Sequence, residues 1–400
     1  MHGQKRNEYK ARLQDPKTAA GLAHKAQQWH ALSQELQTRR GKDDAAERAT
    51  TAALIEKALL VNPDPNYLWN YRRELLGNDD NNNLKVLDKE LTLTQAALTR
   101  NPKSYGAWFH RKWIIREECK SNNNPSTLDK ILQTELALTA NFLQLDERNF
   151  HCWNYRRFVV AAVAMASATK LGGTVDGSWE FLMDDNPMGP QLAESSSSTI
   201  TPSSTGDDPS ALLFQELILS EFQFTTQKIH DNFSNFSAFH YRSQLLELMV
   251  STGNQSSNKS ELVETELQLV ENAMCTEPDD QTANWYHAFL LDWIRDDKEE
   301  YQDRLLEQAD LLRELIEEAP GKWVLLGLHR LLEFLNEQPE EQVQLLEQLV
   351  ELDGDRAERY RVLLQEAGSK WIVDSAFALV NWQMVFLYIL HLALFFCWVS

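Results

Sequence analysis

The sequence predicts an all-α fold in which short helices, taken in pairs, stack into a solenoid. Three observations predict it. One short phrase of aromatic and basic residues recurs along the chain, apolar residues between the copies follow the helical period, and patterns typical of strands are nearly absent. Because a pair of short amphipathic helices cannot bury its apolar faces alone, successive pairs have to pack against one another.

The recurring phrase is clearest at residues 101–113, which read NPKSYGAWFHRKW. It returns as NPDPNYLWNYRR at 62–73, NFHCWNYRR at 149–157, NFSAFHYR at 235–242 and QTANWYH at 281–287. We predict that one aromatic ring in each copy fills the groove between adjacent helix pairs, and we call these rings the anchors: Trp69, Trp108, Trp153, Phe239 and Trp285. Successive anchors lie 39, 45, 86 and 46 residues apart, and weaker units follow near Trp323 and Tyr360.

Each unit is predicted to contain two helices. In the second unit, Leu87, Leu91 and Leu98 recur near the helical period and give their segment one apolar face. Asn101-Pro102 is expected to end that helix and begin the next. Asn caps helices well, and Pro at the first helical position loses no N–H that the helix needs.

The arginines that follow the anchors are predicted to be structural. The pairs Arg72-Arg73 and Arg156-Arg157 should bond to carbonyl groups or acids of the neighbouring repeat, with their stems packed on the rings. Neither the rings nor these arginines need a ligand to explain them.

Composition divides the chain into an N-terminal segment with the first helices (1–50), the repeat solenoid (51–366) and a hydrophobic tail (371–400). The long interval between the third and fourth anchors is one ordinary unit plus an insert at 172–209. This insert is rich in Gly, Ser, Thr and Pro, and we predict that it is disordered. Within the tail, residues 382–400 contain no Asp, Glu, Lys or Arg and are long enough to span a membrane. A membrane anchor, a buried apolar helix and an erroneous extension of the gene model all stay open.

The charge and the cysteines exclude some classes of protein. The net charge is −20, from 59 acidic and 39 basic side chains, and this argues against nucleic-acid binding, which needs a basic surface. Acids of the later repeats, such as Asp292, Asp296 and Asp297, are candidates for a surface that binds a basic partner. The four cysteines lie far apart, and no CxxC or HxxxH spacing predicts a metal site. With an N-terminus that lacks an apolar signal sequence, these features predict a reducing, cytoplasmic location.

Lys103 is the exception among the copies, because no other copy has a lysine just ahead of its anchor helix. A cation at a helix N-terminus opposes the helix macrodipole, so lysine is a poor structural choice there. The free N–H groups of a helix N-terminus favour anions instead. Lys103 and the hydroxyl of Tyr105 therefore form a candidate phosphate-binding cluster.

The anchor phrase followed by (N/H)(Y/H)RR resembles the repeats of protein prenyltransferase α subunits. Within that family, DERNFHCWNYRRFV at 146–159, NFSNFSAFHYRS at 232–243, NPKSYGAWFHRKW at 101–113 and the opening MHG resemble the Rab geranylgeranyltransferase (type II) group, over about residues 1–365. The resemblance implies a right-handed α-α superhelix of tetratricopeptide-like repeats. Animal members also carry an immunoglobulin-like domain and leucine-rich repeats, for which 400 residues leave no room.

The resemblance also implies an activity. Such enzymes transfer a geranylgeranyl group from geranylgeranyl diphosphate to C-terminal cysteines of Rab GTPases, which a Rab escort protein presents. A zinc ion held by the partner β subunit activates the thiol, and the α subunit works only in the heterodimer. Lys103 and Tyr105 are implied to stabilise the departing diphosphate, and His151 to face the same site next to Phe150, where the family has a tyrosine. His2 matches a position that can reach the zinc until substrate displaces it; a disordered N-terminal tail is the alternative.

Two other functions stay open: a non-catalytic helical-repeat adaptor, and the α subunit shared by farnesyltransferase and geranylgeranyltransferase type I. Lys103 favours prenyl transfer over the adaptor, since an adaptor has no use for one lysine in one repeat. The shared subunit would be expected to read KNYxxWxHRR around that lysine and to begin with a proline-rich segment, and this sequence does neither.

Overall fold

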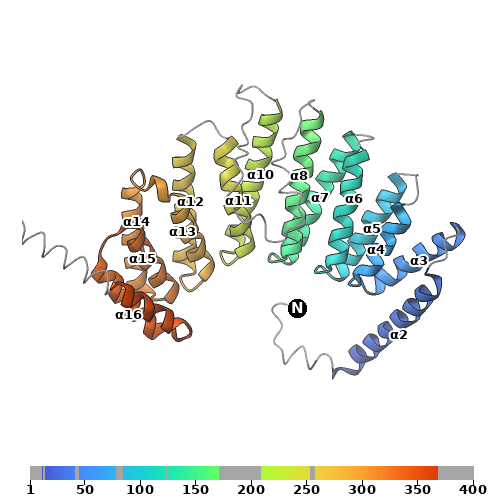
Figure 1. The fold of residues 1–400 in the computed structure, drawn as a ribbon, viewed down its shortest axis with the longest axis horizontal. Coiled ribbons are helices and arrows are strands. Elements are labelled where there is room, and N and C mark those ends of the chain that lie inside the picture. The colour runs from blue at the N-terminus through green and yellow to red at the C-terminus, as the bar shows by residue number, and fades with distance from the viewer. Residues whose placement is uncertain are drawn as a thin grey trace, which may run out of the picture. The chain divides into compact units, whose positions relative to one another are not determined.

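The computed structural model describes residues 11, 14–40, 45–77, 84–121, 125–170, 209–252 and 257–367. Within these ranges every regular element is a helix and no strand occurs, which confirms the predicted all-α fold (Figure 1). Three predictions concern residues outside the described ranges: the role of His2, the disorder of the 172–209 insert, of which only Pro209 is described, and the nature of the 371–400 tail.

The chain divides into two compact units, Met1–Leu217 and Ile218–Ser400. The helices of the first unit are α2 (Pro16–Arg39), α3 (Ala45–Val61), α4 (Asn66–Gly77), α5 (Leu84–Arg100), α6 (Tyr105–Ser121), α7 (Pro125–Leu145) and α8 (Phe150–Lys170). Helix α10 (Pro209–Asp231) contains the boundary between the units. The second unit continues with α11 (Phe236–Thr252), α12 (Ser257–Thr276), α13 (Gln281–Trp293), η2 (Arg295–Asp297), α14 (Gln302–Glu318), α15 (Lys322–Leu335), α16 (Pro339–Leu352), η3 (Gly354–Arg356) and a helical stretch at 357–367.

Helices pack in pairs within each unit, and the pairs stack. In the first unit α3 packs on α4, α5 on α6 and α7 on α8, while the second helices of these pairs, α4, α6 and α8, pack on one another in turn. In the second unit α12 packs on α13 and α14 on α15, and α11, α13 and α15 form the corresponding stack. This is the predicted arrangement of helix pairs; the handedness of the superhelix stays a prediction.

The links before the second helices differ from the prediction. Residues 101–104 separate α5 from α6, so Pro102 lies in the link and not in the first helical turn. The side-chain oxygen of Asn101 accepts the backbone N–H of Lys103 (3.1 Å) and closes a turn. The hydroxyl of Ser104 then caps α6 by accepting a backbone N–H (3.4 Å). The prediction that Asn101 caps the helix was wrong because Asn also closes turns of this kind on its own backbone.

Each tryptophan anchor is hydrogen-bonded to the link that precedes its own helix. The indole N–H groups of Trp69, Trp108 and Trp153 each donate to a backbone carbonyl of the preceding link, at 2.8 Å in all three cases. The anchor rings then pack on an aromatic ring of the following repeat: Trp69 on His110 with ring centroids 4.9 Å apart, Trp108 on Tyr155 at 5.1 Å, and Phe239 on Tyr286 at 4.9 Å. The prediction that the anchors are buried between repeats is confirmed for Trp69, Trp108 and Phe239, and Trp153 is buried as well.

A buried charged network accompanies three of the anchors, Trp69, Trp108 and Phe239. Three residues after the anchor, an arginine binds a glutamate in the first helix of the next pair, and the aromatic residue two positions after the next anchor binds the same carboxylate. These networks are Arg72–Glu90–His110, Arg111–Glu135–Tyr155 and Arg242–Glu266–Tyr286. The predicted bonding to an acid of the neighbouring repeat is confirmed for Arg72. Arg73 donates to Asn70 in its own helix, and Arg156 donates to the carbonyl of Leu136 in the helix paired with its own.

Trp285 is not an anchor, contrary to the prediction. Tyr286 occupies the place two residues after the anchor, so the anchor position of α13 belongs to Asn284, which is 4% exposed, whereas Trp285 is 37% exposed. Gly327 of α15 approaches so closely that a Cβ added there would lie 2.7 Å from the Asn284 Oδ1 atom. The fifth repeat therefore has a short amide where the other anchors have a bulky ring, and the neighbouring Trp285 packs on Phe236 of α11 with ring centroids 4.9 Å apart.

Candidate functional site

Lys103, Tyr105 and His151 come together where α6 and α8 begin. Tyr105 is the first residue of α6 and His151 the second of α8, and these two helices pack on each other. Their rings meet edge to face, with centroids 4.1 Å apart and planes at 81°. The ring of Phe150 lies 3.9 Å from that of His151. Because Tyr105 is 62% exposed, its hydroxyl group can reach a ligand.

Lys103 lies in the link before α6, and its ammonium group is 3.5 Å from a carboxylate oxygen of Asp146 in the link before α8. The two side chains are 38% and 34% exposed. Ion pairs this exposed to water contribute only about 0.2–1 kcal/mol. An anion that binds Lys103 can therefore displace Asp146 at little cost.

His151 is neutral in this environment. Burial, assisted by the charge of Lys103, lowers the pKa of His151 to about 4, and the side chain is 8% exposed. A neutral imidazole carries one N–H donor and one acceptor nitrogen. His151 can therefore donate a hydrogen bond to an anion without adding a charge of its own.

Two side chains fix the links that hold this cluster. The amide nitrogen of Asn149 donates to the carbonyl of Pro102 (2.9 Å), which ties the two links together. The hydroxyl of Ser104 donates to the carbonyl of Pro63 (2.7 Å) in the preceding link. Both side chains are buried, so the backbone around Lys103 is held in place.

The sequence interpretation missed Asp146 and Asn149. Asn149 caps α8 by accepting the N–H groups of His151 (3.1 Å) and Cys152 (3.2 Å), and asparagine is a common residue at that position. Asp146 stands seven residues before its anchor, where Asn62 and Asn101 stand in the first two units. That change from an amide to a carboxylate was the signal in the sequence.

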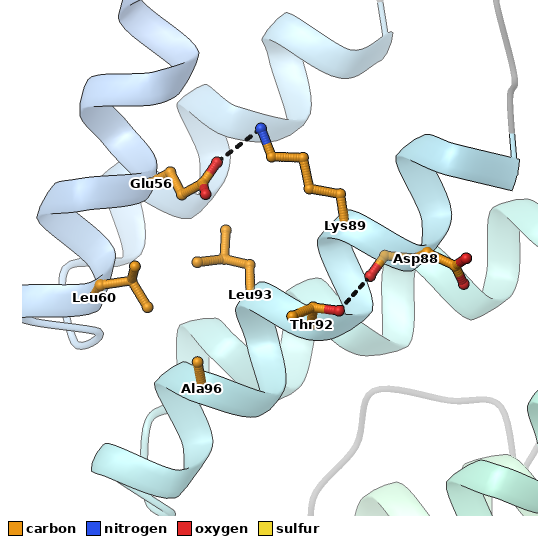
Figure 2. A pocket seen from close by; sticks show the side chains of 7 residues that line it. All are labelled: Glu56, Leu60, Asp88, Lys89, Thr92, Leu93 and Ala96. Atoms are coloured by element: carbon orange, nitrogen blue, oxygen red, sulfur yellow. Dashed lines mark hydrogen bonds and ion pairs between the residues drawn. The ribbon is translucent and has the colours of Figure 1, made fainter.

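Two surface hollows lie away from these residues. Figure 2 shows one of about 300 Å³ between α3 and α5, lined by Leu60 and Leu93 and bordered by the ion pair of Lys89 with Glu56 (2.9 Å). The other, of about 830 Å³, lies in the second unit between α13 and α15, with Trp285 and Arg330 in its wall. Neither contains Lys103, Tyr105 or His151, although Asp292, one of the acids predicted to bind a partner, lines the second.

Other predicted features can be located in the described residues. Asp292 pairs with Arg295 and Asp297 with Lys259, so two of the proposed partner-binding acids already have basic partners. The described ranges contain no group of three or more His, Cys, Asp or Glu side chains placed to hold a metal ion. None of the helices in the described part of the chain combines the length and apolar character that crossing a bilayer requires.

The helix pairs match a known repeat. The family model of the protein prenyltransferase alpha subunit repeat matches residues 51–79, 87–118, 132–163 and 218–249. The first three matches cover most of the pairs α3–α4, α5–α6 and α7–α8, and the fourth covers α10 from the unit boundary onward together with most of α11.

Curated relatives carry one recurrent name. The chain is 29% identical over 339 residues to the geranylgeranyl transferase type-2 subunit alpha of Saccharomyces cerevisiae, a match that covers 79% of this chain and 84% of the yeast protein. It is 30% identical over 246 residues to the subunit of the same name from Rattus norvegicus, covering 60% of this chain and 33% of that one. It is also 30% identical over 299 residues to the alpha 2 subunit of Arabidopsis thaliana, covering 73% and 36%. The chain thus spans most of the yeast relative but only about a third of the rat and plant ones.

A solved structure supports the fold. A chain of the Candida albicans protein geranylgeranyltransferase-I complexed with GGPP aligns with a TM-score of 0.50 at 16% identity, over 80% of this chain and 84% of that one. At this identity the likeness concerns the fold alone. Together with the similarity to relatives from yeast, mammals and plants, the four repeat matches show that the chain contains protein prenyltransferase alpha subunit repeats.

Proposed function

We propose that this chain is the α subunit of a Rab geranylgeranyltransferase (type II). It would act with a zinc-binding β subunit to transfer a geranylgeranyl group from geranylgeranyl diphosphate to C-terminal cysteines of Rab GTPases, which a Rab escort protein presents. The observation that carries the proposal is the meeting of Lys103, Tyr105 and His151 at the start of two neighbouring helices. The type-2 name shared by the relatives supports it.

The chemical role of this cluster is to stabilise the leaving diphosphate. As the bond between the isoprenoid carbon and the diphosphate oxygen breaks, negative charge grows on the phosphate oxygens, and cations and N–H or O–H donors aimed at them lower the barrier. Lys103 supplies the cation, the Tyr105 hydroxyl one donor and His151 a second. His151 donates without adding charge, because its pKa of about 4 keeps it neutral near pH 7. Phe150, beside it, packs on His151 but donates nothing.

The remaining parts of the reaction belong to the partner subunit. We propose that zinc is held there and lowers the pKa of the substrate thiol, since a thiolate and not a thiol attacks carbon. His2 would reach that zinc in the absence of substrate. The enzyme would work in the reducing environment of the cytoplasm, which agrees with the free thiols of Cys119, Cys152 and Cys275.

The two alternatives are less favoured. A non-catalytic adaptor gives no reason for a lysine, a tyrosine and a neutral histidine to meet at one place. The shared α subunit of farnesyltransferase and geranylgeranyltransferase type I fits less well, because the curated relatives above bear the type-2 name.

Co-expression tests the proposal. The chain would be produced with the β subunit of its own species and assayed for transfer of labelled geranylgeranyl to a Rab protein, with and without escort protein. We expect a stable heterodimer whose transfer to Rab depends on the escort protein. A chain that remains monomeric in the presence of β would contradict the proposal, and transfer to a farnesyltransferase-type peptide substrate without escort would favour the shared subunit.

A further inference from the structure

Lys103 is not free in this structure, although the proposed reaction needs its charge. Its ammonium group lies 3.5 Å from a carboxylate oxygen of Asp146. Asp146 belongs to the link that leads into His151, so the acid comes from the same part of the chain as a proposed donor to the diphosphate. A carboxylate at this place repels any anion that approaches Lys103.

A basic residue of the link that contains Asp146 is also close to an acid. Arg148 precedes α8 just as Lys103 precedes α6, and its Nε atom lies 3.9 Å from a carboxylate oxygen of Glu147. The arginine side chain is 60% exposed. Each of the two cations in these links therefore has a carboxylate nearby, and their charges are balanced before any anion binds.

Asp146 stands at a repeat position where three other units carry an asparagine and the fifth unit carries Glu277. Asn62, Asn101 and Asn232 stand seven residues before their anchors, and each accepts the backbone N–H two residues further on, at 3.2, 3.1 and 2.9 Å. The third unit has Asp146 there, and its carboxylate faces the one lysine of these links. An amide would be sufficient to close the turn, so the turn alone does not account for the charge.

We propose that Asp146 is a positioning residue and that Asp146 and the diphosphate bind the ammonium group of Lys103 in turn. It holds the ammonium group in the cluster before substrate arrives, yields it when the diphosphate binds, and takes it back as pyrophosphate leaves. The exchange moves no proton and breaks no covalent bond. It rests on the proposed function, because it takes Lys103 to be the cation that binds the diphosphate.

The consequence is a site that releases its product readily. Pyrophosphate must compete with Asp146 for Lys103, and it must also approach a carboxylate of like charge. Without that carboxylate, pyrophosphate should stay bound more tightly. Asp146→Asn is a well-matched variant, because asparagine is the residue that the equivalent positions of the first, second and fourth units carry.

The test is inhibition of the heterodimer by inorganic pyrophosphate, measured in competition with geranylgeranyl diphosphate. We expect the inhibition constant of Asp146→Asn to fall about three- to tenfold below that of the wild type, as expected when one nearby like charge is removed. Asp310→Asn is the control, because it makes the same change of net charge at a side chain that is 75% exposed and pairs with Arg313. It should leave the inhibition constant unchanged.

A double-mutant cycle separates the proposed role of Lys103 from the proposed exchange with Asp146. In a Lys103→Ala background only the repulsion between the carboxylate and the anion remains, so Asp146→Asn should lower the inhibition constant by a clearly smaller factor than it does when Lys103 is present. An unchanged or higher inhibition constant for Asp146→Asn alone would overturn the exchange, and so would an equal fall in Asp310→Asn. If Lys103→Ala itself alters neither inhibition nor transfer, the proposed role of Lys103 fails; if Lys103→Ala weakens both while Asp146→Asn has no effect, only the exchange fails.

Discussion

The guanidinium group of Arg111 donates two hydrogen bonds to the carboxylate of Glu135, both at 2.6 Å, across the boundary between two repeats. The two residues are 2% and 1% exposed. The hydroxyl of Tyr155, in the helix paired with that of Glu135, adds a third hydrogen bond at 2.7 Å. This buried network joins consecutive helix pairs, so the chief role of the repeated segment of the sequence is to stack one helix pair on the next.

Removing Arg111 should destabilise the first unit strongly. Arg111→Ala leaves the Glu135 carboxylate buried without its cation, a change that typically costs about 3–5 kcal/mol. Urea unfolding followed by circular dichroism measures the loss. Arg361→Ala is the matched control, because Arg361 pairs with Glu358 at the surface and should cost less than about 1 kcal/mol. Equal midpoints for the two variants would contradict this description of the network.

Gly106 should tolerate no side chain. A Cβ atom there would lie 2.3 Å from the Cδ1 atom of Trp69 and 2.8 Å from the Oδ1 atom of Asn66. Gly106→Ala would force the buried anchor to move, and overpacking of this kind costs about 1–3 kcal/mol. Gly21→Ala in α2, where a Cβ meets nothing within 4 Å, should instead stabilise the helix by up to about 1 kcal/mol. Thermal unfolding of both variants checks the opposite signs, and a stabilised Gly106→Ala would be incompatible with the packing described.

The two tryptophans Trp69 and Trp285 should behave differently on truncation. Trp69 is fully buried, and removing a buried aromatic ring costs about 3–5 kcal/mol. Trp285 is 37% exposed, so Trp285→Ala should cost clearly less in the isolated chain. Chemical unfolding of the two alanine variants makes the comparison. Similar losses would mean that Trp285 is an anchor after all.

His151 should titrate far below an ordinary histidine. Burial and the neighbouring charge of Lys103 lower its pKa from 6.5 to about 4. Between these two values the unfolded chain binds a proton that the folded chain does not, so this group reduces stability as the pH falls from 6.5 to 4. NMR titration of the imidazole signals, with His151→Gln to identify the resonance, measures the pKa. It should rise in Lys103→Ala, and a wild-type value near 6.5 would contradict the burial and charge assigned to this site.

The sequence alone was sufficient for the fold class, the helix pairs and four of the five anchors, because large aromatic rings and helical periodicity are strong local signals. The sequence was not sufficient for the register of the fifth unit. Trp285 stands next to the anchor position, and taking it as the anchor shifted the alignment by one residue. Aligning Tyr286 with Tyr241 would have given the correct register. Glu90, Glu135 and Glu266 were missed for a different reason. In the sequence they look like the charges of a solvated helix face, and only the packing of the repeats shows that they are buried.

The candidate site also has residues that could be predicted from the sequence and a contact that could not. Lys103 stood out because lysine is unusual at that position, Tyr105 because its hydroxyl follows two residues later, and the resemblance to a family added His151. The pairing of Lys103 with Asp146 could not be predicted, because it depends on how two links lie side by side although the two residues are 43 positions apart in the sequence.

The most direct test of the proposed function is the rate of a single turnover in the heterodimer with Lys103→Ala. Removing one charge-stabilising group should slow geranylgeranyl transfer to Rab more than about tenfold, in line with the loss of such donors in other enzymes. Lys89→Ala is the control, because it removes another exposed, paired lysine of the same unit and should leave the rate unchanged. Assembly with β should be intact in both. A Lys103→Ala heterodimer that assembles normally and transfers at the wild-type rate would contradict the role of Lys103 at the diphosphate.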